Sequence, residues 1–270
     1  MSVGATRLPR APAAERQYRR DGRVAYRSGL IQSARLVACE TRVGRCFEYN
    51  YDRHLVDVTA PLFAVVDSEC DDGNAGDTVV ASLLDARADL IRASNDTPDA
   101  IEKVLTEAIG AAHRSIESIP KGARGYGGGA SVTVLSVCGD VGIVAHVGDC
   151  RLYVRQREGW IRQTEDHTLL EQLRAHGKEP TDPKRELGII TRVVGFPPGS
   201  IDTLRFQIAT QAEVLLCTRG AWIPTDPIGA AAPLPANLDG THAAELLLDN
   251  YTQSGEMDNA TLVLATLGVQ

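Results

Sequence analysis

The stretch Ala145-His146-Val147-Gly148-Asp149-Cys150-Arg151-Leu152-Tyr153 decides the fold of this chain. It joins two apolar runs, at 142–145 and 151–154, through a polar turn that contains Asp149. Short apolar runs separated by such turns predict neighbouring antiparallel strands. An aspartate at the end of a strand lies at the edge of a sheet, which is a common place to present a ligand. The stretch therefore predicts two strands with an acidic turn between them.

Three other segments also place a charged residue beside an apolar run. The charged residues are Asp67, Arg219 and Asp258. The runs lie at 62–66, 214–217 and 262–264. Continuous apolar runs of this length are typical of buried strands, whose ends open on a cleft. These charged residues are therefore candidates for a functional site.

Apolar runs and amphipathic helices follow one another along residues 36–270. Apolar residues recur at helical spacing in 77–93, 97–116, 168–175 and 242–251. Strands are predicted at 36–39, 54–58, 62–66, 132–135, 142–145, 151–154, 159–162, 204–208, 214–217 and 260–267. Strands in meander order with helices in separate pairs indicate an α+β layered domain.

Composition predicts a soluble globular protein. Of the 270 residues 43% are hydrophobic and 23% are charged, which excludes disordered and fibrous classes. The longest apolar stretches have the length of strands, so we expect no membrane span and no secretory signal. The six cysteines have no zinc or redox spacing. We therefore expect buried free thiols and a cytoplasmic location.

Charge is distributed unevenly along the chain. Residues 1–30 hold seven arginines against two acidic residues, a charge of +5, so the remainder carries −12 of the total of −7. We expect no nucleic-acid partner for an acidic protein. Residues 1–35 are predicted to form an arginine-rich flexible arm able to touch an acidic partner, and residues 36–270 to form one domain.

Several ordered motifs resemble those of one enzyme family. The stretch 145–153 and the segment 163–169 are similar to the AHVGDSR and LTxDHSL motifs of the metal-dependent protein serine/threonine phosphatases, the type 2C or PPM family. The turn at 191–195 is similar to the TRALG motif, and Asp258-Asn259 to the closing DN. Ordered motifs are harder to match by chance than one short pattern. The resemblance, to the bacterial type, covers residues 37–270 and implies an α-β-β-α sandwich of two central antiparallel sheets flanked by helix pairs.

The resemblance also implies a metal site. Members of the family use aspartates to hold two or more Mg²⁺ or Mn²⁺ ions, which prefer oxygen ligands. Two such ions about 3.5–4 Å apart activate a water and clamp the phosphate. Asp67 matches the bridging aspartate, Asp258 the DN aspartate and Asp149 an aspartate associated with a third metal. Asp52 matches the second acid of the NED motif, and Ser68 replaces a glycine whose carbonyl is a ligand.

Further departures from the family pattern affect the same site. Tyr51 replaces the glutamate that orders metal-bound water, and the segment 69–73 contains a one-residue insertion. Phe47 replaces the arginine that grips the phosphate, and an apolar ring cannot make the bidentate contacts of a guanidinium. Arg219 replaces an aspartate of the metal centre. Three separate catalytic elements are therefore missing.

Arg219 puts a fixed positive charge where a divalent cation expects a negative ligand. It both removes a ligand and repels the ion. Close carboxylates left without a cation would be costly. We therefore expect Arg219 to pair with Asp67 or Asp258 and to replace the charge of the metal by an ion pair.

Two hypotheses for the function follow. In the first, the protein is a pseudophosphatase that needs no metal and binds a phosphoprotein or a kinase-pathway protein. In the second, it is an active Mg²⁺- or Mn²⁺-dependent enzyme whose site is rebuilt from Asp67, Asp149 and Asp258 with Asp71 or Asp72. Loss of three catalytic elements favours the first. An N-terminal nucleophile hydrolase shares the layered architecture, but the arginine-rich arm gives no clear processing site.

His146 and His167 lie within the motif segments. A lone histidine beside a strand is more often a hydrogen-bonded structural residue than a base. We therefore expect both to be structural.

Overall fold

The computed structural model describes residues 34–69, 74–119, 128–157, 159–196, 200–208, 211–226, 240–255 and 258–268. Residues 1–33 of the predicted arm lie outside these ranges, as do Asp71 and Asp72. The flexibility of the arm and the part of these two aspartates in a metal site stay predictions.

The strands of the described residues form two antiparallel sheets of five strands each. The first sheet has the order β1 (Ala34–Arg42), β10 (Ala260–Gly268), β9 (Gln211–Cys217), β6 (Arg151–Gln156) and β7 (Gly159–Arg162). The second has the order β2 (Arg53–Asp57), β3 (Leu62–Ser68), β4 (Ala130–Cys138), β5 (Val141–Val147) and β8 (Asp202–Gln207). Each predicted strand overlaps one of these.

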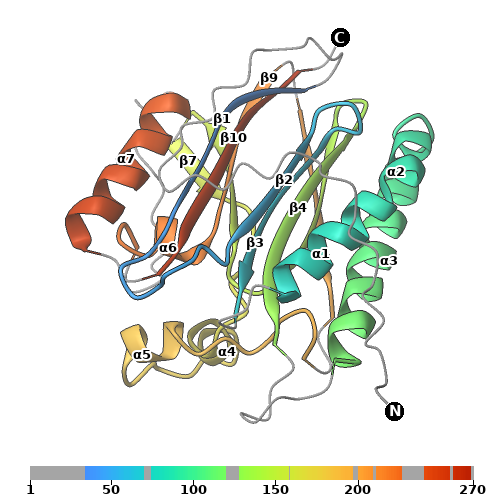
Figure 1. Cartoon of the computed structure of the whole chain (residues 1–270). Helices are drawn as coiled ribbons and strands as arrows, with labels where there is room; N and C mark the ends of the chain where they lie inside the picture. Colours follow the sequence, from blue (N-terminus) through green and yellow to red (C-terminus); the bar gives the residue numbers. More distant parts are fainter. Residues whose placement is uncertain are drawn as a thin grey trace, which may run out of the picture.

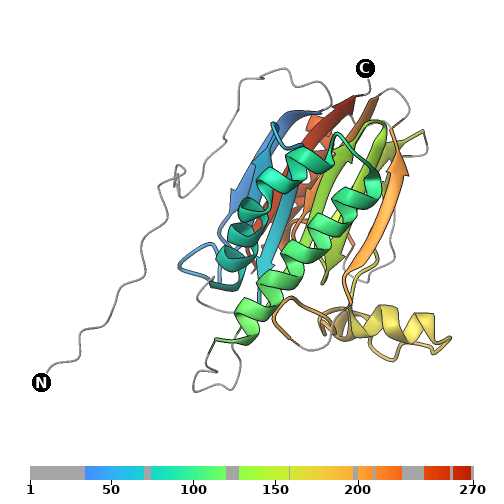
Figure 2. The same ribbon diagram turned by 90° about the vertical axis from the view of Figure 1, so that its right-hand side faces the viewer.

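Helices cover the outer faces of the two sheets (Figure 1). The second sheet is covered by α1 (Asn74–Asp85), α2 (Arg87–Ala93) and α3 (Pro98–Glu117), which lie together in front of it in Figure 2. The first sheet is covered by α6 (Arg219–Trp222) and α7 (Gly240–Ser254). Two short helices, α4 (Leu169–Ala175) and α5 (Pro183–Leu187), lie beyond one end of the sheets. The predicted α-β-β-α sandwich is confirmed.

Alternation of side chains along β3 explains the layers. Ala64 and Val66 pack toward the helices α1 and α3, and Phe63 and Val65 pack toward the first sheet. All four are fully buried. A strand buried on both faces reads as a continuous apolar run, so the sequence 62–66 predicted a central strand correctly.

The helices differ from the sequence expectation in two places. The predicted helix 77–93 is divided into α1 and α2 at Ala86. The sequence does not reveal this break, because the apolar spacing continues across it. The predicted second helix is α3, where Thr97 accepts a hydrogen bond from the Ala100 amide at 3.2 Å and Pro98 begins the helix. Helices α5 and α6 were not predicted, since four or five residues are too few for a periodic pattern.

Two further expectations concern membranes and thiols. In the ranges given above, the helices are too short or too polar to cross a membrane. Cys39, Cys138, Cys150 and Cys217 are free thiols, and three of them, Cys39, Cys150 and Cys217, are buried. The expectation of buried free thiols is confirmed for these three.

Candidate functional site

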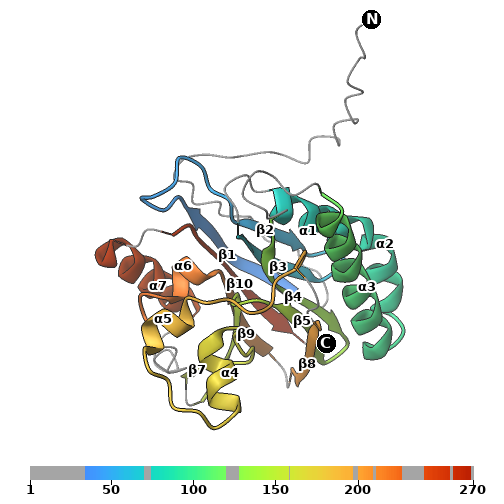
Figure 3. The same cartoon turned by 90° about the horizontal axis from the view of Figure 1, so that it is seen from below.

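The candidate site lies at the end of the sandwich where β3 stops and β6 begins, the end seen from below in Figure 3. Asp67 of β3 pairs with Ser131 of β4. The next residue of β4, Val132, pairs with Val147 of β5, so the turn that contains Asp149 follows at the same edge. Accordingly, the negative charge of Asp149 contributes to raising the pKa of Asp67. Pairing register thus brings together two aspartates that are distant in sequence.

The first sheet contributes the other half of the site. Thr218 follows β9, and its amide donates to the Thr261 carbonyl of β10 at 2.9 Å. Its hydroxyl donates to Asp52 Oδ2 at 2.7 Å. Asp52 precedes β2 of the second sheet, so this bond joins the two sheets beside Arg219.

Three of the predicted aspartates are buried. The pKa of Asp67 is raised by burial and then by the charges of Asp52 and Glu69. Burial raises the pKa of Asp52 to about 7, although the Thr218 hydroxyl opposes the shift. Burial raises the pKa of Asp149 to about 6, although the charge of Arg219 opposes it. These carboxylates are therefore held close together with too few cations.

Glu69 is a site residue that the resemblance did not predict. The Ser131 hydroxyl donates to Glu69 Oε1 at 3.0 Å. The pKa of Glu69 is raised to about 8, by burial of the carboxylate and then by the charge of Asp149. The residue as a whole is nevertheless exposed, so solvent reaches this side of the cluster. A signal existed: Glu69 stands two residues after Asp67, on the same side of an extended chain. We call Asp52, Asp67, Glu69, Asp149 and Asp258 the acidic cluster.

Arg219 is the first residue of α6 and faces the acidic cluster. Its Nε lies 3.7 Å from Asp149 Oδ2, and its Nη1 lies 3.7 Å from Asp258 Oδ2. Burial lowers the pKa of Arg219, but the charges of Asp149 and Asp258 outweigh it and the pKa is raised. The expected ion pair with Asp258 is confirmed. The pair with Asp149 was not predicted, and Asp67 acts on Arg219 only through its charge.

These residues do not fit the two-metal centre that the resemblance implies. In the described parts of the chain, His, Cys, Asp and Glu side chains form no group of three or more arranged to hold a metal ion. A guanidinium stands against two of the carboxylates instead. The assignment of Asp52, Asp67, Ser68, Asp149 and Asp258 as metal ligands stays a prediction.

Ser68, Phe47 and Tyr51, which differ from the family pattern, lie in the segments that carry Asp67 and Asp52 of the acidic cluster. Ser68 ends β3, and its hydroxyl accepts a hydrogen bond from the Gly76 amide of α1 at 3.1 Å. The rings of Phe47 and Tyr51 contact each other edge to face, with centroids 5.8 Å apart. Their loop is tied to the site where the Gly44 amide donates to Asn259 Oδ1 at 2.9 Å. Rings thus stand in the segment where the resemblance implies a phosphate-gripping guanidinium.

Both motif histidines are structural, as expected. Nδ1 of His167 accepts a hydrogen bond from the Gly148 amide at 2.9 Å, and Nε2 lies 3.0 Å from Asp202 Oδ2. His146 lies between the Thr133 hydroxyl and the Glu165 carbonyl, and burial lowers its pKa to about 4. Since His167 holds the Gly148 amide, it positions the turn that presents Asp149.

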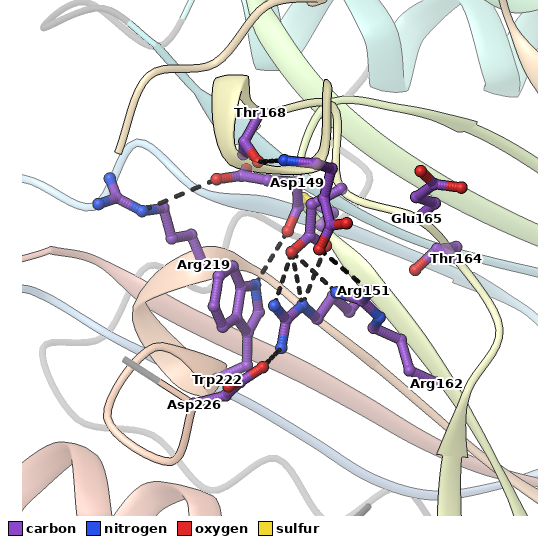
Figure 4. Close-up of polar contacts among 12 residues, drawn as sticks. Asp149, Arg151, Arg162, Thr164, Glu165, Thr168, Arg219, Trp222 and Asp226 are labelled. Carbon is purple, nitrogen blue, oxygen red and sulfur yellow. Dashed lines mark hydrogen bonds and ion pairs between the residues drawn. The ribbon is translucent and has the colours of Figure 1, made fainter. Parts of the chain in front are cut away.

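A buried ion-pair network lies behind Asp149 (Figure 4). Arg151 of β6 is fully buried and lies 2.6 Å from Asp166 Oδ2 and 2.8 Å from Asp226 Oδ2. Its guanidinium carbon lies 3.3 Å from the ring centroid of Trp222. Trp222 Nε1 in turn donates to the Asp149 carbonyl at 2.9 Å. This network fixes α6, and hence Arg219, against the backbone of Asp149.

Replacing Gly220 with alanine is expected to lower the free energy of unfolding by on the order of 3 kcal/mol. A Cβ there would lie 2.0 Å from the Asn259 carbonyl oxygen, a backbone atom that cannot turn away. Urea denaturation followed by circular dichroism measures the loss. Gly110→Ala in α3 is the control, because its nearest atom is the flexible Arg114 guanidinium at 3.5 Å. The control should gain up to about 1 kcal/mol, and equal losses in both variants would contradict the close packing of α6.

The fold has clear counterparts among solved structures. The serine/threonine phosphatase PstP/Ppp of Mycobacterium tuberculosis matches 88% of this chain and 99% of its own with a TM-score of 0.69 and 19% identity. The S. agalactiae serine/threonine phosphatase matches 86% and 98% with a TM-score of 0.70 and 20% identity. Stp1 of Staphylococcus aureus matches 92% and 100% with a TM-score of 0.70 and 17% identity.

Two more findings bear on these likenesses. One structure of the PstP catalytic domain is a complex with 2 manganese ions. No family model and no curated protein matches the chain. At identities of 17 to 20% the structural likeness establishes the fold alone.

Proposed function

Since this chain has the fold of the PPM-type serine/threonine phosphatases, we propose that it is a pseudophosphatase that acts by binding. The partner class is a phosphoprotein or a kinase-pathway protein, in the cytoplasm. The solved counterparts are serine/threonine phosphatases, which supports this class of partner.

One observation carries the proposal. The Arg219 guanidinium lies 3.7 Å from both Asp149 and Asp258. A fixed positive charge at this distance opposes a divalent cation on the same carboxylates. Without the ions, the family's means of activating water and neutralising the phosphate are lost.

The second candidate is an active Mg²⁺- or Mn²⁺-dependent phosphatase with an atypical site. It is favoured by Glu69, an additional carboxylate whose pKa responds to Asp149. It is also favoured by Asp149 itself, since neither of its carboxylate oxygens accepts a hydrogen bond from the described residues. In that case Glu69 would compensate for the ligand lost at Arg219.

Calorimetric titration with Mn²⁺, alongside hydrolysis of p-nitrophenyl phosphate and a phosphopeptide, separates the two candidates. We expect no tight Mn²⁺ binding and no metal-dependent turnover. The manganese-binding PstP catalytic domain is the positive control under the same conditions. Tight binding at two or more sites with metal-dependent turnover would overturn the proposal in favour of the enzyme.

A further inference from the structure

The acidic cluster holds more negative charge than Arg219 can balance. The cluster has five carboxyl groups: the charges of four of them act on the Arg219 guanidinium, and the fifth, Asp52, acts on Asp67. Arg151 is already engaged by Asp166 and Asp226. A second cation would therefore relieve the repulsion that remains.

Asp149 is the side chain that points to such a ligand. It is fully buried, and neither carboxylate oxygen accepts a hydrogen bond from the described residues. The Ser131 hydroxyl is close enough to lower the pKa of Asp149, but its single proton is donated to Glu69 Oε1 at 3.0 Å. Asp52 Oδ1 is buried and lacks a hydrogen bond in the same way. Buried carboxylate oxygens without donors are costly, and a ligand rich in N–H donors would satisfy them.

A phosphate group does not suit this cluster. A phosphorylated side chain carries nearly two negative charges, which the ionised carboxylates of the cluster would repel. Phe47 stands at the position of the family's phosphate-gripping arginine and offers no hydrogen-bond donor. Arg219 is held by Asp149 and Asp258.

A guanidinium suits the cluster better than a divalent metal. Mg²⁺ and Mn²⁺ demand an octahedral set of oxygens, and the described residues form no such group. A guanidinium has five N–H donors in a planar fork and pairs with carboxylates two at a time. Asp258 has 26% of its side chain exposed, so the cluster can be reached from solvent. The aromatic residues Phe47 and Tyr51 precede Asp52, and aromatic faces attract guanidinium groups.

We propose that the acidic cluster binds the arginine side chain of a basic segment of a partner protein. The inference rests on the proposed function, since a metal-loaded enzyme would have its carboxylates occupied. It specifies the chemistry of the partner: the site takes a cationic side chain and not a phosphate.

The test is calorimetric titration of the full chain with an acetylated, amidated hexapeptide of alternating arginine and serine. The same peptide with citrulline in place of arginine keeps the shape and removes the charge. A third peptide carries phosphoserine in place of serine. We expect the arginine peptide to bind at least about tenfold more tightly than the citrulline peptide, a difference of about 1.4 kcal/mol. Binding should weaken at 0.5 M salt, roughly where screening shortens to a few ångströms.

Asp258→Asn tests the site itself. Asp258 is partly exposed, so the variant should fold, and we expect it to weaken binding of the arginine peptide about fivefold or more. Glu107→Gln is the matched control, an exposed acid on α3 that faces Lys103. It should leave the affinity within about twofold. Equal loss in both variants, equal binding of citrulline, or tighter binding of phosphoserine would overturn the proposal.

The chain itself contains a basic segment, so the source of the arginine is tested separately. In the full chain, Arg16, Arg19, Arg20 and Arg23 are replaced by glutamine. Unchanged affinity, the result we expect, excludes the chain's own segment as the source of the arginine, whereas tighter binding of the peptide would identify that segment as the occupant in place of a partner. Mn²⁺ titration in the same buffer tests the proposed function separately from this inference. Mn²⁺ binding with turnover would overturn the proposed function, whichever peptides bind.

Discussion

Arg219→Asp is expected to raise the affinity of the chain for Mn²⁺ by about a hundredfold or more. The change removes the guanidinium from Asp149 and Asp258 and supplies a carboxylate at the same strand end. Each tenfold gain corresponds to about 1.4 kcal/mol. Without metal, the variant adds a sixth acid to the acidic cluster and should lose on the order of 2 kcal/mol of stability. Calorimetry and thermal melting with and without Mn²⁺ measure both effects.

Two further substitutions of Arg219 separate the effect of its positive charge on Mn²⁺ binding from the effect of the missing carboxylate ligand. Arg219→Lys keeps the positive charge and should leave Mn²⁺ unbound. Arg219→Ala removes the charge without adding a ligand and should bind Mn²⁺ weakly. Mn²⁺ should raise the melting temperature of the aspartate variant, because a ligand that binds only the folded state stabilises it. If the unaltered chain binds Mn²⁺ as tightly as the aspartate variant, Arg219 does not replace the metal.

Arg151→Met is expected to lower the free energy of unfolding by about 3–5 kcal/mol. The change takes from the fully buried Asp166 the guanidinium 2.6 Å away and leaves it only Arg162, at 3.0 Å, among the guanidinium groups paired with it in the described residues; it also removes one partner of Asp226. Loss of one member of a buried ion-pair network leaves negative charge in the interior that the remaining arginine compensates only in part. Methionine fills a similar volume, so the loss reports the charge more than a cavity. Urea denaturation measures the difference.

Arg155→Met is the matched control for this measurement. Arg155 lies on the same strand, β6, but its side chain, which pairs with Glu213, is 31% exposed. Exposed ion pairs contribute up to about 1 kcal/mol, so this variant should lose no more than that. Similar losses at both positions would mean that burial of the network has little influence on stability.

The strands were predictable from sequence because each is an apolar run of the length of one strand. The run 62–66 is buried on both faces in β3, and this is the pattern that identifies a central strand. The break between α1 and α2 at Ala86 was not predictable, because the apolar spacing runs across it. The spacing of apolar residues therefore predicts where a helix or strand lies better than where it begins or ends.

The candidate site was predictable only where a motif names a residue. Asp52, Asp67, Asp149 and Asp258 are brought to one end of the sandwich, as the resemblance implies. Glu69 was missed because it belongs to a segment where the chain departs from the family's length. The contact between Arg219 and Asp149 was missed because it depends on how two sheets stack, and no local pattern encodes that distance.

The cation of this site is part of the chain. A metal ion is held at equilibrium, so its occupancy falls when the ion is scarce or removed by a chelator. Arg219 is attached to α6, and Trp222 of the same helix is tied to the Asp149 backbone, so its charge cannot be diluted or exchanged. In the proposed pseudophosphatase, we therefore expect the shape of this end of the sandwich to be independent of the supply of divalent ions, so that the protein presents the same surface in ion-rich and ion-poor surroundings.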